Sequence, residues 1–159
     1  LSLDVFFFFK QKTAYVFIAG DWSSDVCSSD LFARHQRWAE GVRAAVKAWG
    51  LQIQCADQAV YSPILTGVMM PEGVDADAVR KIIHERFDCS LGTGLGKIKG
   101  KMFRIGHLGD TNDLTLLGAL AGCEMGMKLA GVKLAGSGVL AAMDHFSSHA
   151  AATPLRRAA

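Results

Sequence analysis

Regular apolar periodicity, which decides what part of this chain can build a core, begins only at Phe32. From there the apolar residues recur at the spacing i, i+3, i+4 and i+7, and they are Val42, Ala45, Val46 and Trp49. This spacing predicts an amphipathic helix over residues 32–49, with its charged side chains on the other faces. Those side chains are Arg34, Arg37, Glu40, Arg43 and Lys47. Gly50 is well placed to end the helix, because glycine readily adopts the left-handed conformation of a helix cap.

The residues before Phe32 show no sustained helical or strand period. They repeat the triplet Ser-Ser-Asp at 23–25 and 28–30, and residues 6–31 resemble a translated sequencing-adapter read-through. We therefore expect residues 1–31 to be a non-native or disordered leader, the alternative being a natural amphipathic leader. The apolar run near its start is far shorter than the roughly 20 residues of a membrane helix, and it lacks the flanks of a signal peptide.

The middle of the chain alternates short apolar runs with turn signals. Three runs are rich in β-branched or apolar residues and predict strands, and they are residues 51–55, 60–70 and 102–107. Pro63 is confined to a sheet edge or a strand start. Asp75 is a good N-cap, which predicts a helix from there to about Phe87. The glycine- and lysine-rich stretch from Cys89 to Lys101 predicts a loop or an irregular hairpin.

Two further helices are predicted to close the domain. Asp110 or Thr111 caps the first, which ends near Gly131, and the second runs over residues 137–146. The first is expected to bury Leu114, Leu117, Leu120 or Ala121, and Met125. The order α, β, β, α, β, α, α predicts an α+β fold, a mostly antiparallel sheet covered by helices with one open side. This domain occupies residues 32–147, and residues 148–159 form a frayed tail.

Composition excludes several classes of function. The formal net charge of +2 is too small to indicate a nucleic-acid or acidic-membrane partner, so we assign neither. Lys97, Lys99 and Lys101 form the one dense basic run, which favours a solvated loop over a phosphate-binding patch. The four cysteines contain no C-x-x-C pair, which excludes a zinc knuckle and is typical of reduced thiols in the cytoplasm.

The other motifs do not indicate a catalytic or metal-binding site. Gly92 to Gly96 lacks the spacing of a phosphate-binding loop, so a flexible loop is favoured, with a lid beside a site as the alternative. Of the five histidines, only His145 and His149 have a metal-like spacing, and they lack the glutamate of a zinc protease. All five are therefore interpreted as surface residues, and no metal is assigned. No G-x-S-x-G motif supports a nucleophile.

Arg104 is the residue best suited to bind a ligand. It lies between Phe103 and Ile105 in a predicted strand, so its side chain points to the face opposite these two. A solvent-facing arginine is one interpretation. The other is a grip on a small carboxylate through two parallel charge-assisted hydrogen bonds, a geometry that lysine does not reproduce.

Three passages carry a resemblance to a known family, and they are Pro71 to Ala76, Gly94 to Gly96 with Gly100 to Gly109, and Gly136 to Val139. Together they resemble class V pyridoxal-phosphate aminotransferases, in particular the serine–glyoxylate and alanine–glyoxylate aminotransferase group. The resemblance covers about residues 32–146 and is most specific around Arg104. It implies the C-terminal small domain of a fold type I subunit, in a homodimer, with Arg104 on the substrate carboxylate. It also implies amino transfer from serine or alanine to glyoxylate, giving glycine, with pyridoxal phosphate as the electron sink.

The cofactor-binding groups of that family lie before the matching segment. They are a Schiff-base lysine, an aspartate facing the pyridine nitrogen and the phosphate ligands. We therefore expect a fragment with no catalytic or cofactor-binding residue of its own, inactive when alone.

Two alternatives remain, a free-standing α+β module for small-molecule binding or regulation and a domain that only mediates dimerisation. A fragment is expected to expose apolar surface beside Arg104 or on the helix with Val42 and Trp49, whereas a finished module is not. The sequence does not choose between serine, alanine and other amino donors.

Overall fold

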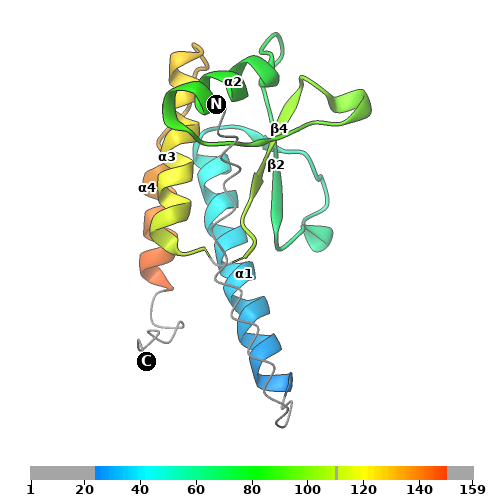
Figure 1. Ribbon diagram of the computed structural model, residues 1–159, viewed down its shortest axis with the longest axis vertical. Coiled ribbons are helices and arrows are strands. Elements are labelled where there is room, and N and C mark those ends of the chain that lie inside the picture. The colour runs from blue at the N-terminus through cyan, green and yellow to red at the C-terminus, as the bar shows by residue number, and fades with distance from the viewer. Residues whose placement is uncertain (1–23, 110, 150–159) are drawn as a thin grey trace, which may run out of the picture.

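The computed structural model describes residues 24–109 and 111–149 and shows a four-stranded sheet with helices on one face (Figure 1). The helices are α1 (Ser24–Ala48), α2 (Ala76–Phe87), α3 (Asp113–Leu129) and α4 (Gly138–Ser148). The strands are β1 (Gln52–Ile53), β2 (Leu65–Met69), β3 (Gly92–Thr93) and β4 (Met102–Gly106). α1 and α2 contact the sheet, and α3 and α4 pack against these two helices. The predicted α+β class is confirmed, and none of the described helices is long and apolar enough to cross a membrane.

The sheet has the strand order β1-β2-β4-β3, and every neighbouring pair is antiparallel. β2 and β4 form its centre, where Val68 lies opposite Phe103 and Gly67 lies opposite Arg104. Because side chains alternate along a strand, Val68 and Phe103 enter the core and Arg104 points to the other face. No described helix packs on that face, so Arg104 lies on the open side of the sheet.

α1 begins at Ser24, ahead of the predicted start at Phe32. No glycine or proline lies between these residues to stop a helix. The rest of the predicted leader lies outside the described residues. The four predicted core residues are buried, and Gly50 has the positive φ of 77° expected after the helix end. Arg37 and Arg43, which the periodicity places on the other faces of the helix, are also buried, in contacts with other elements.

The strand predicted over residues 60–70 is shorter than expected. Its start belongs to a 3-10 turn, η1 (Gln58–Val60), and β2 begins only after Pro63. The glycine- and lysine-rich stretch contains β3 and a second turn, η2 (Gly96–Ile98), and β3 pairs with β4. The irregular hairpin is confirmed, but the pattern does not predict β3, because a glycine and a threonine alone show no alternation.

Side-chain caps start the three later helices. Asp75 caps α2 as predicted, and Ser137 caps α4; each accepts a hydrogen bond from a backbone N–H of the first turn. The cap of α3 is Asn112 and not Thr111, and Asp110 lies outside the described residues. The tail from residue 150 onward also lies outside them.

The buried face of α3 differs in part from the prediction. Leu120 is buried, but Leu114 and Met125 are exposed. The side chains that pack inward are Leu116, Leu120, Cys123 and Met127. α3 is apolar around much of its circumference, so periodicity leaves the buried face open. Gly126 favours the observed face, because the Ile83 side chain of α2 occupies the space a Cβ atom would need there.

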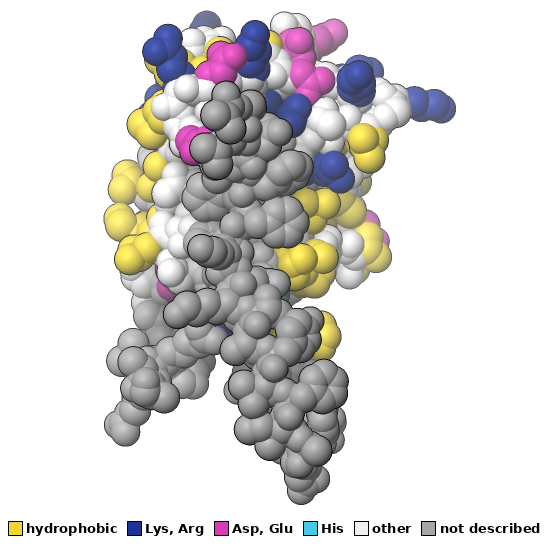
Figure 2. All heavy atoms as spheres, viewed as in Figure 1, with side chains coloured by type: hydrophobic (Ala, Val, Ile, Leu, Met, Phe, Trp, Pro, Cys, Tyr) yellow, Lys and Arg dark blue, Asp and Glu magenta, His cyan; other side chains and the backbone are white. Residues whose placement is uncertain are grey.

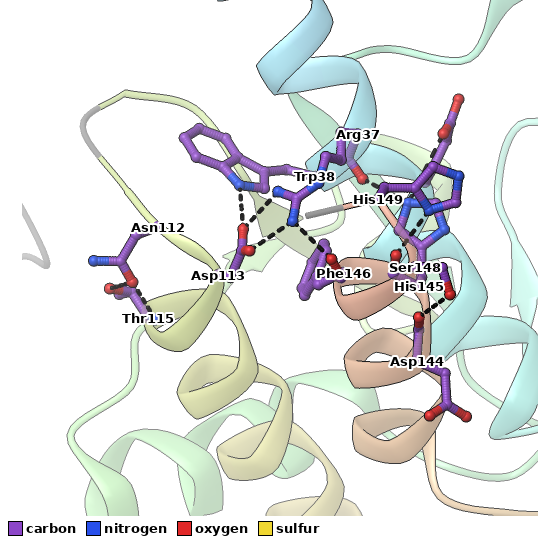
Figure 3. Close-up of polar contacts among 11 residues, drawn as sticks. Arg37, Trp38, Asn112, Asp113, Thr115, Asp144, His145, Phe146, Ser148 and His149 are labelled. Atoms are coloured by element: carbon purple, nitrogen blue, oxygen red, sulfur yellow. Dashed lines mark hydrogen bonds and ion pairs between the residues drawn. The ribbon is translucent and has the colours of Figure 1, made fainter. Parts of the chain in front are cut away.

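A carboxylate of α3, Asp113, binds two side chains of α1, and one of these also reaches α4 (Figure 3). It accepts hydrogen bonds of 2.7 and 2.6 Å from the Arg37 guanidinium and one of 3.0 Å from the Trp38 indole. The same guanidinium donates a 3.0 Å bond to the carbonyl of Phe146 in α4. Arg37 is buried and Asp113 is partly exposed, so this bidentate pair is only partly shielded from water.

Glu124 is the second carboxylate of α3 that ties helices together. It is buried and accepts hydrogen bonds from Trp49, Lys128, Ser137 and the backbone N–H of Val139. Burial acts to raise its pKa, but these donors outweigh burial and lower the pKa to about 2. Glu124 is therefore ionised, and it joins the end of α1 and the start of α4 to α3.

Replacing Asp113 by Asn is expected to lower the free energy of unfolding by about 2 kcal/mol, because the buried Arg37 loses its counter-ion while the partly exposed site admits some water. Urea unfolding followed by circular dichroism measures this. Glu85→Gln is the matched control, since it removes an exposed pair with Lys81 at 3.8 Å and should cost below about 0.5 kcal/mol. Equal losses for the two variants would contradict the role given to Asp113.

Candidate functional site

Arg104 lies in the middle of β4 with a glycine opposite it on both neighbouring strands. These partners are Gly67 of β2 and Gly92 of β3. A Cβ atom at Gly92 would lie 3.0 Å from Arg104 Nε and 3.1 Å from its Cβ, closer than packed side chains tolerate. A Cβ atom at Gly67 would lie 2.6 Å from the end of Met102. Gly92 therefore leaves room for the Arg104 side chain to lie over β3, whereas the space at Gly67 is filled by the end of the Met102 side chain.

α2 holds the short strand β3 in place beside Arg104. Arg80 donates two hydrogen bonds to the Leu91 carbonyl, at 2.8 and 2.6 Å. Asp77 accepts from the Thr93 hydroxyl at 2.9 Å and from Arg80 at 2.8 Å. The bond from Thr93, followed by the one from Arg80, lowers the pKa of Asp77 and keeps it ionised. Side chains of α2 thus position a strand that is too short to be held by its backbone hydrogen bonds to β4 alone.

A pocket of about 170 Å³ opens beside Arg104, at the edge of β2. It lies between β2 and the segment that follows β1, and side chains from both border it, such as Tyr61 and Leu65. Arg43 of α1 lines it as well. Among the described residues, no aspartate, glutamate or lysine lines this pocket. The charged residues that line it are therefore Arg43 and Arg104.

The Arg104 guanidinium is available to a ligand. Within residues 24–109 and 111–149 it forms no ion pair, and its buried Nε–H has no hydrogen-bond acceptor. A carboxylate is well matched, because its two oxygens accept two parallel N–H bonds from a planar guanidinium.

His107 is only 1% exposed and supports the wall of this pocket from the end of β4. Its Nδ1 lies 3.1 Å from the Pro63 carbonyl oxygen and its Nε2 lies 2.9 Å from the Thr66 hydroxyl. A carbonyl only accepts, so Nδ1 carries the proton and Nε2 accepts from Thr66. Burial is the main cause that lowers the pKa of His107 to about 4, so the ring is neutral at pH 7.

The interpretation of all five histidines as surface residues is wrong for two of them. His35 and His107 are buried, because each ring finds hydrogen-bond partners inside the protein. His145 and His149 stack with ring centres 4.4 Å apart, and no group of metal-binding side chains gathers in the described part of the chain.

The basic run and the cysteines stay away from the pocket. Lys97, Lys99 and Lys101 are exposed, and none lines it. Figure 2 shows basic and acidic side chains interspersed around the end of the molecule that carries α2. Cys55, Cys89 and Cys123 are free thiols, and of these only Cys55 borders the pocket.

Apolar side chains are exposed beside Arg104 and not on the α1 face with Val42 and Trp49, which is buried. Val60, 68% exposed, and Leu65, 38% exposed, border the pocket. A second exposed apolar surface lies on α3 and α4, where Figure 2 shows hydrophobic side chains along one edge. Its residues are Leu114, Met125, Leu129, Leu140 and Met143.

Sequence reasoning selected Arg104 but missed the residues that shape its surroundings. Gly67 and Gly92 flank Arg104 because of the register of the strands, which cannot be read from the sequence. One signal was available, since an isolated glycine in the run Leu-Thr-Gly-Val-Met indicates a close approach of another group. No such sequence signal marks Arg43, because an arginine on a helix is normally interpreted as solvated.

Comparison with known proteins places this site in a family context, although no family model matches the chain. The chain is 46% identical over 122 residues to a serine–glyoxylate aminotransferase of Hyphomicrobium methylovorum. It is 43% identical over 130 residues to an L-aspartate–glyoxylate aminotransferase of Paracoccus denitrificans. These matches cover 76% and 81% of the chain but 30% and 33% of the relatives, so the chain spans about a third of their length.

Solved structures agree with the sequence relatives. A pyridoxamine–pyruvate aminotransferase from Mesorhizobium loti has a TM-score of 0.72 at 34% identity, over 79% of this chain and 32% of that one. A ureidoglycine–glyoxylate aminotransferase from Bacillus subtilis has a TM-score of 0.68 at 30% identity, over 73% of this chain and 30% of that one. The fold is thus one found within aminotransferases. Within that class the chain belongs to the class V group of the serine–glyoxylate and alanine–glyoxylate aminotransferases, as the resemblance implied.

The buried ring of His107 predicts a pH dependence of stability. Its folded pKa of about 4 lies below the ordinary 6.5, so the unfolded chain takes up a proton first as the pH falls. The associated stability is fully present above pH 6.5 and is lost between pH 6.5 and 4. Urea unfolding across this range should show wild type losing about 3 kcal/mol more than His107→Asn. The exposed His84→Asn serves as the control, and equal pH slopes for wild type and His107→Asn would refute the prediction.

Proposed function

We propose that Arg104 binds the carboxylate of an amino-acid or 2-oxo-acid substrate in an aminotransferase that moves an amino group from serine or alanine to glyoxylate, giving glycine. The observation that carries this proposal is a guanidinium on the open face of the sheet, packed over Gly92 and without an ion-pair partner among the described residues. Arg104 also lines a pocket that no acidic side chain borders. Sequence relatives and solved neighbours that are aminotransferases support the reaction class.

The residues around Arg104 have distinct roles in this proposal. Arg104 orients the substrate by its carboxylate and holds it at a fixed place on the sheet. His107, through Pro63 and Thr66, keeps the neighbouring wall in position. The exposed Val60 and Leu65 contribute apolar surface that excludes water once a substrate and the rest of the enzyme cover the pocket.

Pyridoxal phosphate is the cofactor we assign to the complete enzyme, and the described pocket is not its binding site. No lysine there offers an amine to the cofactor aldehyde, and no carboxylate there faces a pyridine ring. We therefore assign cofactor binding to a larger domain of the complete subunit, in line with a chain that spans about a third of its relatives. The bound cofactor supplies the electron sink of amino transfer.

We further assign residues 32–147 to the C-terminal small domain of this subunit, with residues 1–31 as a leader and residues 148–159 as a tail. The complete enzyme is proposed to be a cytoplasmic homodimer. Apolar surface beside Arg104 favours this fragment model over a free-standing binding or regulatory module, because a finished domain seldom leaves such surface open next to its site.

In the complete enzyme, Arg104→Ala is expected to raise KM strongly for carboxylate substrates and to lower kcat/KM by about 2–4 kcal/mol in transition-state stabilisation, because a charge-assisted pair is lost. Steady-state kinetics with serine, alanine and glyoxylate measure this. Arg104→Lys should recover only part of the loss, since charge returns without bidentate geometry. The exposed Arg86→Ala is the control, and an unchanged KM in Arg104→Ala would remove Arg104 from the site.

The isolated 159-residue chain is expected neither to bind pyridoxal phosphate specifically nor to transaminate. Absorbance titration with the cofactor and an assay of glycine formation test this directly. A saturable cofactor absorbance band together with turnover would refute the fragment model, and it would leave the carboxylate-binding role of Arg104 to be judged by the kinetics above.

A further inference from the structure

Two cysteine thiols from different elements meet where the chain leaves α2. Cys89 follows the helix cap Asp88, which has the left-handed φ of 50° and donates its backbone N–H to the His84 carbonyl at 3.0 Å. The chain then packs against α3, where a Cβ atom built on Gly122 would lie 3.8 Å from the Cβ of Cys89. The next residue of α3 is Cys123, and its thiol is hydrogen-bonded to that of Cys89.

The two thiols differ in their access to solvent. Cys123 is 0% exposed and belongs to the core, whereas Cys89 is partly exposed and packs against the edge of the core. A dissolved reagent therefore reaches Cys89 first. Cys55 is also partly exposed, but its thiol donates a 3.3 Å hydrogen bond to the Asp57 carbonyl oxygen and not to a second thiol.

The hydrogen bond between the thiols makes Cys89 the nucleophile of the pair. It is the main cause that lowers the pKa of Cys89, because the Cys123 S–H donates to the Cys89 thiolate. The same hydrogen bond, followed by burial, raises the pKa of Cys123. Since the thiolate is the reactive form of cysteine, Cys89 is activated while Cys123 stays a neutral thiol beside it.

We propose that Cys89 and Cys123 are a peroxide-sensitive pair that oxidises to a disulfide between the end of α2 and α3. First, the Cys89 sulfur attacks the hydroxyl oxygen of a hydroperoxide. An S–O bond forms, the O–O bond breaks, and the departing oxygen takes up the proton that the thiol released. The Cys123 sulfur then attacks the sulfenic acid, so that the S–S bond forms and water leaves with the Cys123 proton. The two thiols lose two electrons, and the peroxide gains them.

The disulfide closes a covalent loop that contains the strands of the candidate site. Residues 90–122 lie between the two cysteines and include β3 and β4, and thus Gly92 and Arg104. In the reduced chain, β3 and its approach are held to α2 by hydrogen bonds of Arg80 and Asp77. The crosslink restricts the unfolded chain, so the oxidised fold is expected to be more stable than the reduced fold.

The test starts from the double variant Cys27→Ser/Cys55→Ser, in which only the proposed pair remains. The folded protein is treated near neutral pH with a small molar excess of hydrogen peroxide, its free thiols are alkylated, and its peptides are mapped without reductant. We expect a linked peptide that joins Cys89 to Cys123, with loss of both free thiols and their recovery after dithiothreitol. Thermal unfolding followed by circular dichroism should show a midpoint raised by on the order of 5–10 °C in the oxidised protein.

Single variants assign the order of the two steps. Cys123→Ala removes the thiol that consumes the sulfenic acid, so dimedone, a reagent for sulfenic acids, should label Cys89 strongly only in this variant. Cys89→Ser should leave the buried Cys123 unoxidised. Cys55 is the matched control, tested in a chain that retains it. Whatever dimedone label Cys55 takes should not change with Cys123→Ala, because its thiol has no bond to Cys123.

Three results would overturn the proposed pair. They are a linked peptide that is absent, a linked peptide that forms only in urea, and a dimedone label at Cys89 that Cys123→Ala leaves unchanged. A linked peptide with no rise in the unfolding midpoint would overturn the stabilising effect of the crosslink. If Cys123→Ala fails to fold, the peptide map of the double variant decides the question. None of these results bears on the carboxylate-binding role of Arg104, which the kinetics of Arg104→Ala test separately.

Discussion

The attachment of α1 to α3 through two carboxylates is the constraint on which the other packing depends. Asp113 binds the indole of Trp38, and Glu124 binds the indole of Trp49. The two contacts lie at separate points along α1, so they fix both its direction and its rotation about its own axis. With that rotation fixed, the core side chains of α1 face the sheet, and Arg43 is directed toward the edge of β2. The hydrogen bonds between the helices thereby determine which charged side chain of α1 lines a pocket on the sheet.

The site itself depends on the rigidity of the sheet. Arg104 lies on a central strand with partners on both sides, which holds its backbone more firmly than a loop would. The neighbouring strand β3 is short, and Arg80 and Asp77 of α2 compensate by hydrogen bonding to its ends. His107 does the same for the approach to β2. Each side of Arg104 is therefore fixed by a polar side chain that does not itself face the proposed ligand.

The sequence predicts those features whose causes are local. The cap Asp75 is predicted from the sequence because a cap acts within one helical turn. The buried face of α3 was not, since its apolar residues surround the helix and the contact with α2 at Gly126 decides between faces. The same distinction applies to the site. Arg104 is marked by its strand and its resemblance to a family, whereas its glycine neighbours and Arg43 reach it only through tertiary structure.

The arginines of this chain differ in how their charges are balanced. Arg37 and Arg80, which fasten elements together, each have a carboxylate partner at short distance. Arg43 and Arg104, which border the pocket, have none among the described residues. Because no acidic side chain lines the pocket, its arginines keep it attractive to anions. A bound anion then supplies the opposite charge, and part of its binding free energy comes from the ion pair that it forms with a guanidinium.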